Sequence, residues 1–189
     1  MFLKDPVYEN INPQEQKTIR FVYISHFSEV NAQDRLIKAF KKMSNKNCEI
    51  VLAGSEDNEY LEKLKMLADG DDKISFRVGL NRDEVCELLS QSDVFVCSSV
   101  WEFYSISLLE AAAKGLTVIT TNVGNAHLIP GVITINNWSE MPRMMDKVCE
   151  IPELRIEIGR LLHSYAFQEG RLEDKLEKLE GIMKDLVKK

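Results

Sequence analysis

The sequence of 189 residues predicts an α/β fold, a doubly wound parallel sheet of about six strands with helices on both faces and a helical carboxyl-terminal tail. Two observations lead to this fold class. Short apolar runs, rich in β-branched and aromatic residues, alternate with longer stretches in which apolar residues recur at helical spacing. The short runs are apolar throughout, as in strands that are buried on both faces of a parallel sheet. Right-handed crossovers between such strands give a Rossmann-like layer.

The first two strands and their helices are expected between residues 19 and 70. The run "IRFVYIS", residues 19–25, is typical of a buried strand. Ser28 should cap the following helix, which is expected to continue through Met43. The run "CEIVLAG" then predicts a second strand, and the next helix should begin near Asn58.

The same alternation continues through the middle of the chain. The stretch "ISLLEAAAKG" follows the fourth apolar run and predicts a helix that ends at Gly115. The remaining four strands are expected at residues 73–79, 93–99, 116–121 and 131–136.

Three regions follow from these patterns. Residues 1–18 carry two prolines among polar neighbours and predict a linker or extended arm. Residues 19–150 hold all the strand signals and form the expected Rossmann-like domain. Residues 151–189 show only helical periodicity, and we expect these helices to pack on the same domain.

Composition excludes several classes of protein. Hydrophobic residues make up 44% and charged residues 29%, and no apolar run approaches the ~20 residues of a membrane-spanning helix. The start "MFLKDPVYEN" lacks the pattern of a signal peptide, so a cytoplasmic location is expected. A net charge of −6 disfavours nucleic acid as a partner. The four cysteines have no metal-binding spacing and are interpreted as reduced thiols.

Two carboxylates flank the predicted start of a helix in "SSVWEFYSISLLEAAAKG". Glu102 follows the fourth strand, so it should lie at the crevice where open parallel sheets bind their ligands. Backbone amides at residues 104–106 can receive an anion, and Glu110 follows one to two turns later. This layout suits a ligand with a central phosphate and hydroxyls on both sides. The bland alternative is one loop charge and one helix charge without a site.

The segment "SSVWEFYSISLLEAAAKGLTVITTNVGN" resembles the signature of retaining glycosyltransferases with the two-domain GT-B fold, particularly family 4. Glu102 and Glu110 match the glutamates of the E-x7-E motif of that family, and Ser105 matches the small residue of its turn. The stretches "LIKAF", "IVLAG", "ISFRVGL" and "SQSDVFVCSS" fall in the same order and spacing. The resemblance extends over about residues 19–189.

The resemblance implies the carboxyl-terminal domain of such an enzyme, which binds a nucleotide-sugar donor. Glu102 would contact the hydroxyls of the transferred sugar as the catalytic residue, and Glu110 would hold the ribose. No metal or other cofactor is implied, because basic residues and helix amides carry the diphosphate charge. The other donor-binding residues that the resemblance implies are His26, Asn31, Gly79, Leu80, Asn81, Phe103, Tyr104, Ser105 and Ile106.

The sequence departs from the family at the diphosphate grip. The expected arginine is His26, and the expected Lys-Gly pair is Asn31 and Ala32. Each lost charge-assisted contact is worth about 1.5–3 kcal/mol, so donor binding could weaken by orders of magnitude. His26 either donates to phosphate or is only a polar cap. Arg77 and Arg82 border the loop on the base side and either compensate for the lost charges or are ordinary surface arginines.

Other departures surround the first glutamate and the helix after it. Phe103 replaces a glycine, Thr117 a proline and Leu128 an acidic residue. Trp101 and Phe103 could stack on a sugar or base, although aromatic residues beside a strand end are more often part of the core.

The favoured function is the donor-binding half of a retaining glycosyltransferase of glycan or polysaccharide assembly. The alternative is a degenerate domain that serves as a binding or assembly module, and an epimerase-like enzyme is disfavoured because no GxGxxG follows the first strand. The resembling enzymes bind their acceptor with an amino-terminal domain. A glycan or lipid-linked acceptor, and any contact with a membrane surface, would therefore come through a further domain or partner chain. The isolated chain is expected to be inactive and could dimerise through the apolar stripe of its last helix, residues 172–187.

Overall fold

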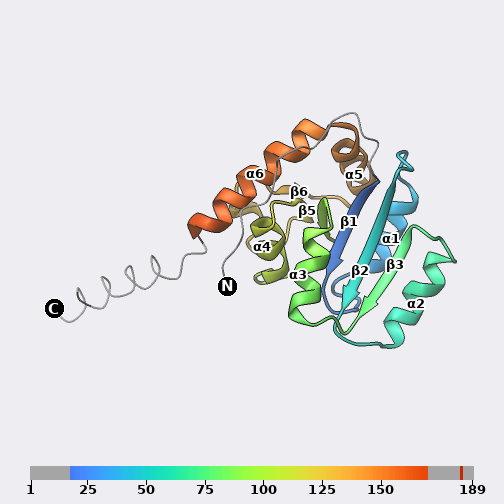
Figure 1. Ribbon diagram of the computed structural model, residues 1–189. Coiled ribbons are helices and arrows are strands. Elements are labelled where there is room, and N and C mark those ends of the chain that lie inside the picture. The colour runs from blue at the N-terminus through green and yellow to red at the C-terminus, as the bar shows by residue number, and fades with distance from the viewer. Residues whose placement is uncertain (1–17, 170–183, 185–189) are drawn as a thin grey trace.

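The structure is a computed structural model that describes residues 18–169 and Lys184. Its centre is a six-stranded sheet with the order β3-β2-β1-β4-β5-β6, in which every pairing is parallel (Figure 1). This confirms the predicted fold class. The strands are β1 (Ile19–Ile24), β2 (Cys48–Gly54), β3 (Ile74–Val78), β4 (Val94–Cys97), β5 (Thr117–Thr121) and β6 (Ile133–Ile135).

The strand order reverses between β1 and β4, which makes this pair the switch point of the sheet. The chain runs outward from β1 to β3 and then returns to β4, so right-handed crossovers place α1 and α2 on one face and α3 and α4 on the other (Figure 1). The helices are α1 (Gln33–Lys41), α2 (Glu59–Ala68), α3 (Arg82–Ser90), α4 (Ile106–Ala113), α5 (Met141–Glu150) and α6 (Pro152–Glu169). Two short 3-10 helices are η1 (Ala126–Leu128) and η2 (Trp138–Glu140).

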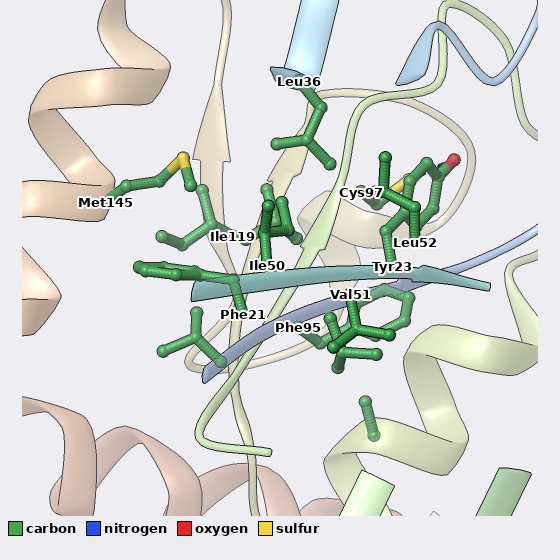
Figure 2. Close-up of a cluster of buried hydrophobic side chains, with 14 of the residues drawn as sticks. Phe21, Tyr23, Leu36, Ile50, Val51, Leu52, Phe95, Cys97, Ile119 and Met145 are labelled. Atoms are coloured by element: carbon green, nitrogen blue, oxygen red, sulfur yellow. Dashed lines mark hydrogen bonds between the residues drawn. The ribbon is translucent and has the colours of Figure 1, made fainter. Parts of the chain in front are cut away.

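The core lies against the central strands, whose residues are buried on both faces (Figure 2). Successive side chains of β2 point to opposite sides of the sheet, so Leu52 and Val51 pack in different layers. Phe21 of β1 is fully buried and meets Phe40 of α1 edge to face at 6.3 Å. Each such side chain contributes about 1.5–3 kcal/mol by leaving water. Burial on both faces explains the uninterrupted apolar runs at residues 21–24, 50–53 and 94–97 of the inner strands.

The start of the first helix was predicted wrongly at Ser28. The helix begins at Gln33, and its N-cap is Ala32, which has a left-handed backbone with φ of 50°. The Ser28 hydroxyl instead accepts a bond from the Asn31 amide at 3.3 Å inside the preceding turn. That turn is fixed from outside, because the amide of Val100 donates to the carbonyl of Val30 at 2.7 Å. The predicted end at residue 43 is also two residues late, since α1 ends at Lys41.

Other helix boundaries agree better with the sequence. Asn58 caps α2 through a bond from the Leu61 amide at 2.9 Å, as its position predicted. Helix α5 was not anticipated; it lies after η2 and packs against α1 and α6. Helix α6 packs on α4 and β5.

Two expectations fall on other parts of the chain. The arm over residues 1–17 and the last helix over residues 172–187 lie outside the described residues, apart from Lys184. In the described part of the chain, no helix combines the length and apolar character needed to cross a membrane.

Candidate functional site

A crevice opens at the carboxyl ends of β1 and β2, beside the start of α3. Its cavity has a volume of about 260 Å³. Parallel α/β sheets bind ligands at this edge, next to the switch point. The cavity is lined by Ile24, Ser25, His26, Ala53, Gly54, Ser55, Leu80 and Val85.

His26 stands at the rim of this crevice and is exposed. Its ring Nδ1 lies 2.7 Å from the hydroxyl of Ser55, which follows β2. The pairing fixes the ring through one nitrogen. The structure therefore places His26 where a ligand in the cavity would meet it.

Asn31, in contrast, is held inside the loop after β1. Its Nδ2 donates to the carbonyl of His26 at 2.7 Å, and its Oδ1 accepts from the Ser99 hydroxyl at 3.1 Å. Its backbone carbonyl accepts from the Ser98 hydroxyl at 2.7 Å. Buried Gln33 adds a bond to the same His26 carbonyl at 2.7 Å. These bonds tie the loop after β1 to the end of β4 and occupy both polar atoms of the Asn31 amide.

Glu102 is connected to the same network through buried Ser99. The Ser99 hydroxyl has one proton, which it can donate either to Glu102 Oε2 at 3.2 Å or to Asn31 Oδ1 at 3.1 Å, and it lies 2.7 Å from the hydroxyl of Tyr23. Burial raises the pKa of Tyr23, so its hydroxyl stays protonated and can donate to Ser99. Figure 2 shows Tyr23 beside Cys97, at the crevice end of β1 and β4. Glu102 is thus linked through Ser99, which follows β4, to Tyr23 of β1.

The loop that carries Glu102 also contacts the end of β5 and the segment that follows it. The Thr121 hydroxyl donates to the Ser99 carbonyl at 2.6 Å. Gly124 has a φ of 56°, and a Cβ at this position would lie 2.9 Å from the carbonyl oxygens of Glu102 and Phe103. Only glycine fits such a close backbone contact in this conformation.

Glu110 lies on α4 and is paired with Arg82, the first residue of α3. The Arg82 Nη1 donates to Glu110 Oε1. The side chain of Glu110 is 19% exposed, whereas that of Arg82 is 61% exposed. The hydrogen bond from Arg82 to Glu110, together with the carboxylate charge, raises the pKa of Arg82. This ion pair thereby connects the start of α3 to α4.

The start of α4 leaves large apolar side chains in solvent. Ser105 is the N-cap, and its hydroxyl accepts from the Leu108 amide at 3.4 Å. Phe103 is 80% exposed and Trp101 is 67% exposed, so the core interpretation of these two aromatic side chains is wrong. Tyr104 and Ile106 are also exposed. The predicted anion-binding amides therefore lie at an open helix start beside exposed aromatic rings.

The loop after β3 contributes backbone and one apolar side chain. Gly79 has a φ of 68°, and its amide donates to the Gly54 carbonyl at 2.9 Å. Leu80 lines the cavity. The Asn81 side chain caps α3 in a capping box with Glu84, so it is occupied by the helix. Of the three predicted residues, Leu80 is the one whose side chain reaches the cavity.

Three polar side chains of the network were not singled out from the sequence: Ser55, Ser99 and Gln33. Ser99 is the buried connection between Tyr23, Asn31 and Glu102. Its place directly after a strand end was the available signal, since strand ends line the crevice of this fold. No sequence pattern indicates the pair of Arg82 and Glu110, which are 28 positions apart.

Across residues 18–169, no three or more His, Cys, Asp and Glu side chains gather in an arrangement that could hold a metal ion.

The parallel layer, the crevice at the carboxyl ends of β1 and β2 and the helices on both faces define a Rossmann-like α/β domain. Residues 5–159 match the family model of glycosyl transferases group 1. The chain belongs to this glycosyltransferase family, and it has the fold of the carboxyl-terminal domain of GT-B enzymes.

Three similar proteins illustrate the match. An N-acetyl-alpha-D-glucosaminyl L-malate synthase of Bacillus anthracis is 26% identical over 179 residues, which are 88% of this chain and 45% of that protein. HepE of Anabaena, solved in complex with UDP and glucose, superposes with a TM-score of 0.80 at 14% identity, over 89% of this chain and 49% of HepE.

The third is the C-terminal domain of LpcC, a glycosyl transferase group 1 family protein of Francisella tularensis. It superposes with a TM-score of 0.72 at 19% identity, over 88% of this chain and 97% of that domain. The chain spans less than half the length of the curated relatives it matches.

Proposed function

We propose that this chain binds a nucleotide-activated sugar and supplies the donor-binding half of a glycosyltransferase. The observation that carries the proposal is that Glu102 and Glu110 lie on either side of the start of α4, the helix that follows β4 of the switch-point pair. A carboxylate is an acceptor for hydroxyl groups, and the amides at a helix start receive phosphate. The arrangement therefore matches sugar, diphosphate and ribose in that order.

Each part of the donor has a proposed place. Glu110 accepts from the ribose hydroxyls, and Leu80 with the backbone of Gly79 borders the base. The amides at the start of α4 and the ring of His26 receive the diphosphate. Glu102, fixed by Ser99, accepts from the hydroxyls of the transferred sugar.

The proposed reaction is transfer of the sugar to a hydroxyl of a glycan or lipid-linked acceptor, with retention of configuration at the anomeric carbon. The family membership and the E-x7-E spacing support this reaction class. HepE, a protein of the same fold, was solved with UDP and glucose, which supports a uridine nucleotide as the first donor to test. The acceptor would be bound by a domain beyond these residues, since the chain spans less than half of its relatives.

A second function is favoured by one observation. Asn31 stands where the resembling enzymes have a lysine, and both polar atoms of its amide are committed to the loop. A domain that has lost this cation could instead serve as a binding or assembly module without transfer.

Calorimetric titration of the full chain separates these functions. UDP, GDP, ADP and the corresponding nucleotide-sugars are titrated into the wild-type chain, Glu110→Gln, Glu102→Gln and the control Glu157→Gln. Glu157 is a matched control because it is an exposed helical glutamate with an arginine partner on α6. Binding of at least one nucleotide-sugar supports the donor-binding role.

The variants test the individual assignments. Glu110→Gln should weaken the nucleotide and the nucleotide-sugar alike, by about 10- to 100-fold, because it removes a charged acceptor for the ribose. Glu102→Gln should weaken only the nucleotide-sugar. Absence of binding to every donor would reject the proposal and leave the non-catalytic module.

A further inference from the structure

The ion pair between Arg82 and Glu110 joins one exposed and one mostly buried side chain. Arg82 begins α3, and its guanidinium donates to the carboxylate of Glu110 on α4. The carboxylate is mostly buried, whereas the arginine is largely exposed. An exposed arginine can leave such a pair by rotation of its side chain, while Glu110 has little freedom to move. The pair is therefore one in which Arg82 is the movable partner.

Ribose and Arg82 compete for the same carboxylate. A ribose with two free hydroxyls donates to both oxygens of a carboxylate, and Arg82 already donates to Oε1 of Glu110. Arg82 keeps its positive charge after leaving, because guanidinium is not deprotonated in proteins. If a displaced Arg82 finds no new anionic partner, the free energy of the broken ion pair is not recovered, and the ligand binds more weakly.

The start of α4 can supply that partner when it holds a phosphate. Glu110 lies four residues after Ile106 on α4, which is about 6 Å along the helix axis. A guanidinium at Glu110 is thus about one helical turn from a phosphate bound at the first amides. Arg82 carries a fixed positive charge, which neither His26 nor Asn31 supplies at the positions of the expected cations.

We propose that Arg82 is a ligand-exchanging residue that determines the preference of this site for nucleotides over nucleosides. In the free protein it neutralises Glu110. When the ribose hydroxyls take Glu110, the guanidinium transfers to the phosphate groups and supplies the cation that positions 26 and 31 lack. This inference rests on the proposed nucleotide-sugar function and assigns a residue to its specificity.

The exchange predicts opposite effects on two kinds of ligand. A nucleoside must break the pair without offering a phosphate, so Arg82 opposes its binding. A nucleoside diphosphate recovers the guanidinium, so Arg82 favours its binding. An arginine that only stabilises the fold would affect both ligands in the same direction.

Titrations with matched ligands and variants test the exchange in the full chain. The nucleotide that binds the wild-type chain and its parent nucleoside are titrated into Arg82→Gln, Arg82→Lys and the control Arg160→Gln. Arg160 is an exposed arginine of α6 that pairs with Glu157 and does not line the cavity. Nucleoside binding is followed by NMR, which detects millimolar affinities, and melting curves confirm that each variant is folded.

Arg82→Gln should weaken the diphosphate by about 10-fold or more and leave the nucleoside unchanged or tighter, because a charge-assisted contact is lost only for phosphate. Arg82→Lys should retain part of the nucleotide affinity, and Arg160→Gln should match the wild type. The side-chain Nε–H signal of Arg82, assigned by its loss in Arg82→Gln, should shift with the nucleotide and not with phosphate-free nucleoside at equal occupancy.

Equal weakening of both ligands, or an unchanged diphosphate affinity in Arg82→Gln, would overturn the exchange. An Nε–H signal that does not move on nucleotide binding would overturn it as well. A wild-type chain that binds no nucleotide rejects the proposed function, and the exchange falls with it. A chain that binds nucleotide independently of Arg82 rejects the exchange alone.

Discussion

Replacement of Gly124 by alanine tests how the loop of Glu102 is held in place. Gly124 has a left-handed backbone with φ of 56°, and an added Cβ would lie 2.9 Å from two backbone carbonyl oxygens, those of Glu102 and Phe103. Backbone atoms cannot rotate away as a flexible side chain can. The loop that carries Glu102 must therefore shift when this residue is alanine.

The expected cost has two parts. Alanine in the left-handed region costs about 1–2 kcal/mol relative to glycine. Overpacking against fixed neighbours typically adds about 1–3 kcal/mol. Gly70 provides the matched control, because it has a φ of 69° and no atom within 4 Å of an added Cβ. Gly70→Ala carries the first cost without the second, and both variants change the entropy of the unfolded chain equally.

The assay is thermal unfolding of both variants, followed by donor titration. In a chain of this length, 1 kcal/mol corresponds to about 2–4 °C in Tm, so Gly124→Ala should melt about 2–12 °C below Gly70→Ala. Gly124→Ala should also weaken the nucleotide-sugar more than the nucleotide, because the displaced Glu102 contacts the sugar. Equal melting temperatures for the two variants would show that the Glu102 loop yields without cost, and the argument for a rigidly placed Glu102 would fail.

Four further outcomes are expected from the same structure. Burial and the neighbouring carboxylate of Asp34 raise the pKa of Tyr60 to about 12. The free energy of unfolding of the wild type should therefore fall relative to that of Tyr60→Phe as the pH rises from about 10 to 12, and denaturant unfolding at each pH measures this difference. Partial burial opposes ionisation of Asp34, but the hydrogen bonds from Lys38 and Tyr60 outweigh this effect and lower the pKa of Asp34. The contribution of Asp34 to the free energy of unfolding should therefore be complete above about pH 4 and should disappear as the pH falls through the lowered pKa. Asp34→Asn should abolish this acid dependence. Leu61→Ala should reduce the free energy of unfolding by about 2–5 kcal/mol, because this side chain of α2 is fully buried. Phe103→Ser should leave the free energy of unfolding within about 0.5 kcal/mol of the wild type, and a larger loss would mean that the ring packs on the domain.

The strands could be predicted from the sequence because their burial is a local property. A strand of a parallel sheet covered on both faces carries a near-continuous apolar run, and residues 50–53 show this without knowledge of the neighbours. The cap of α2 at Asn58 was predicted for the same reason, since an N-cap bond reaches only three residues ahead. The doubly wound parallel layer then followed from the handedness of crossovers, whereas the order of its strands comes from the structure.

The first helix shows where local signals are insufficient. Ser28 has the chemistry of an N-cap, yet α1 begins at Gln33. The turn before it is fixed by the bond from the Val100 amide to the Val30 carbonyl and by the contacts of Asn31 with the end of β4. These partners lie about seventy positions away in the chain, so no window around Ser28 contains them.

The candidate site divides in the same way. The sequence predicted that Glu102 follows the fourth strand and that Glu110 lies on the next helix, because both positions depend on local patterns of strand and helix; their roles at a ligand site stay predictions. Only the tertiary structure decided what each side chain touches: Glu102 the buried Ser99, Glu110 the guanidinium of Arg82, and Asn31 the loop rather than open crevice. Topology is encoded in local patterns of burial, whereas side-chain partners depend on which distant segments the packed sheet brings together.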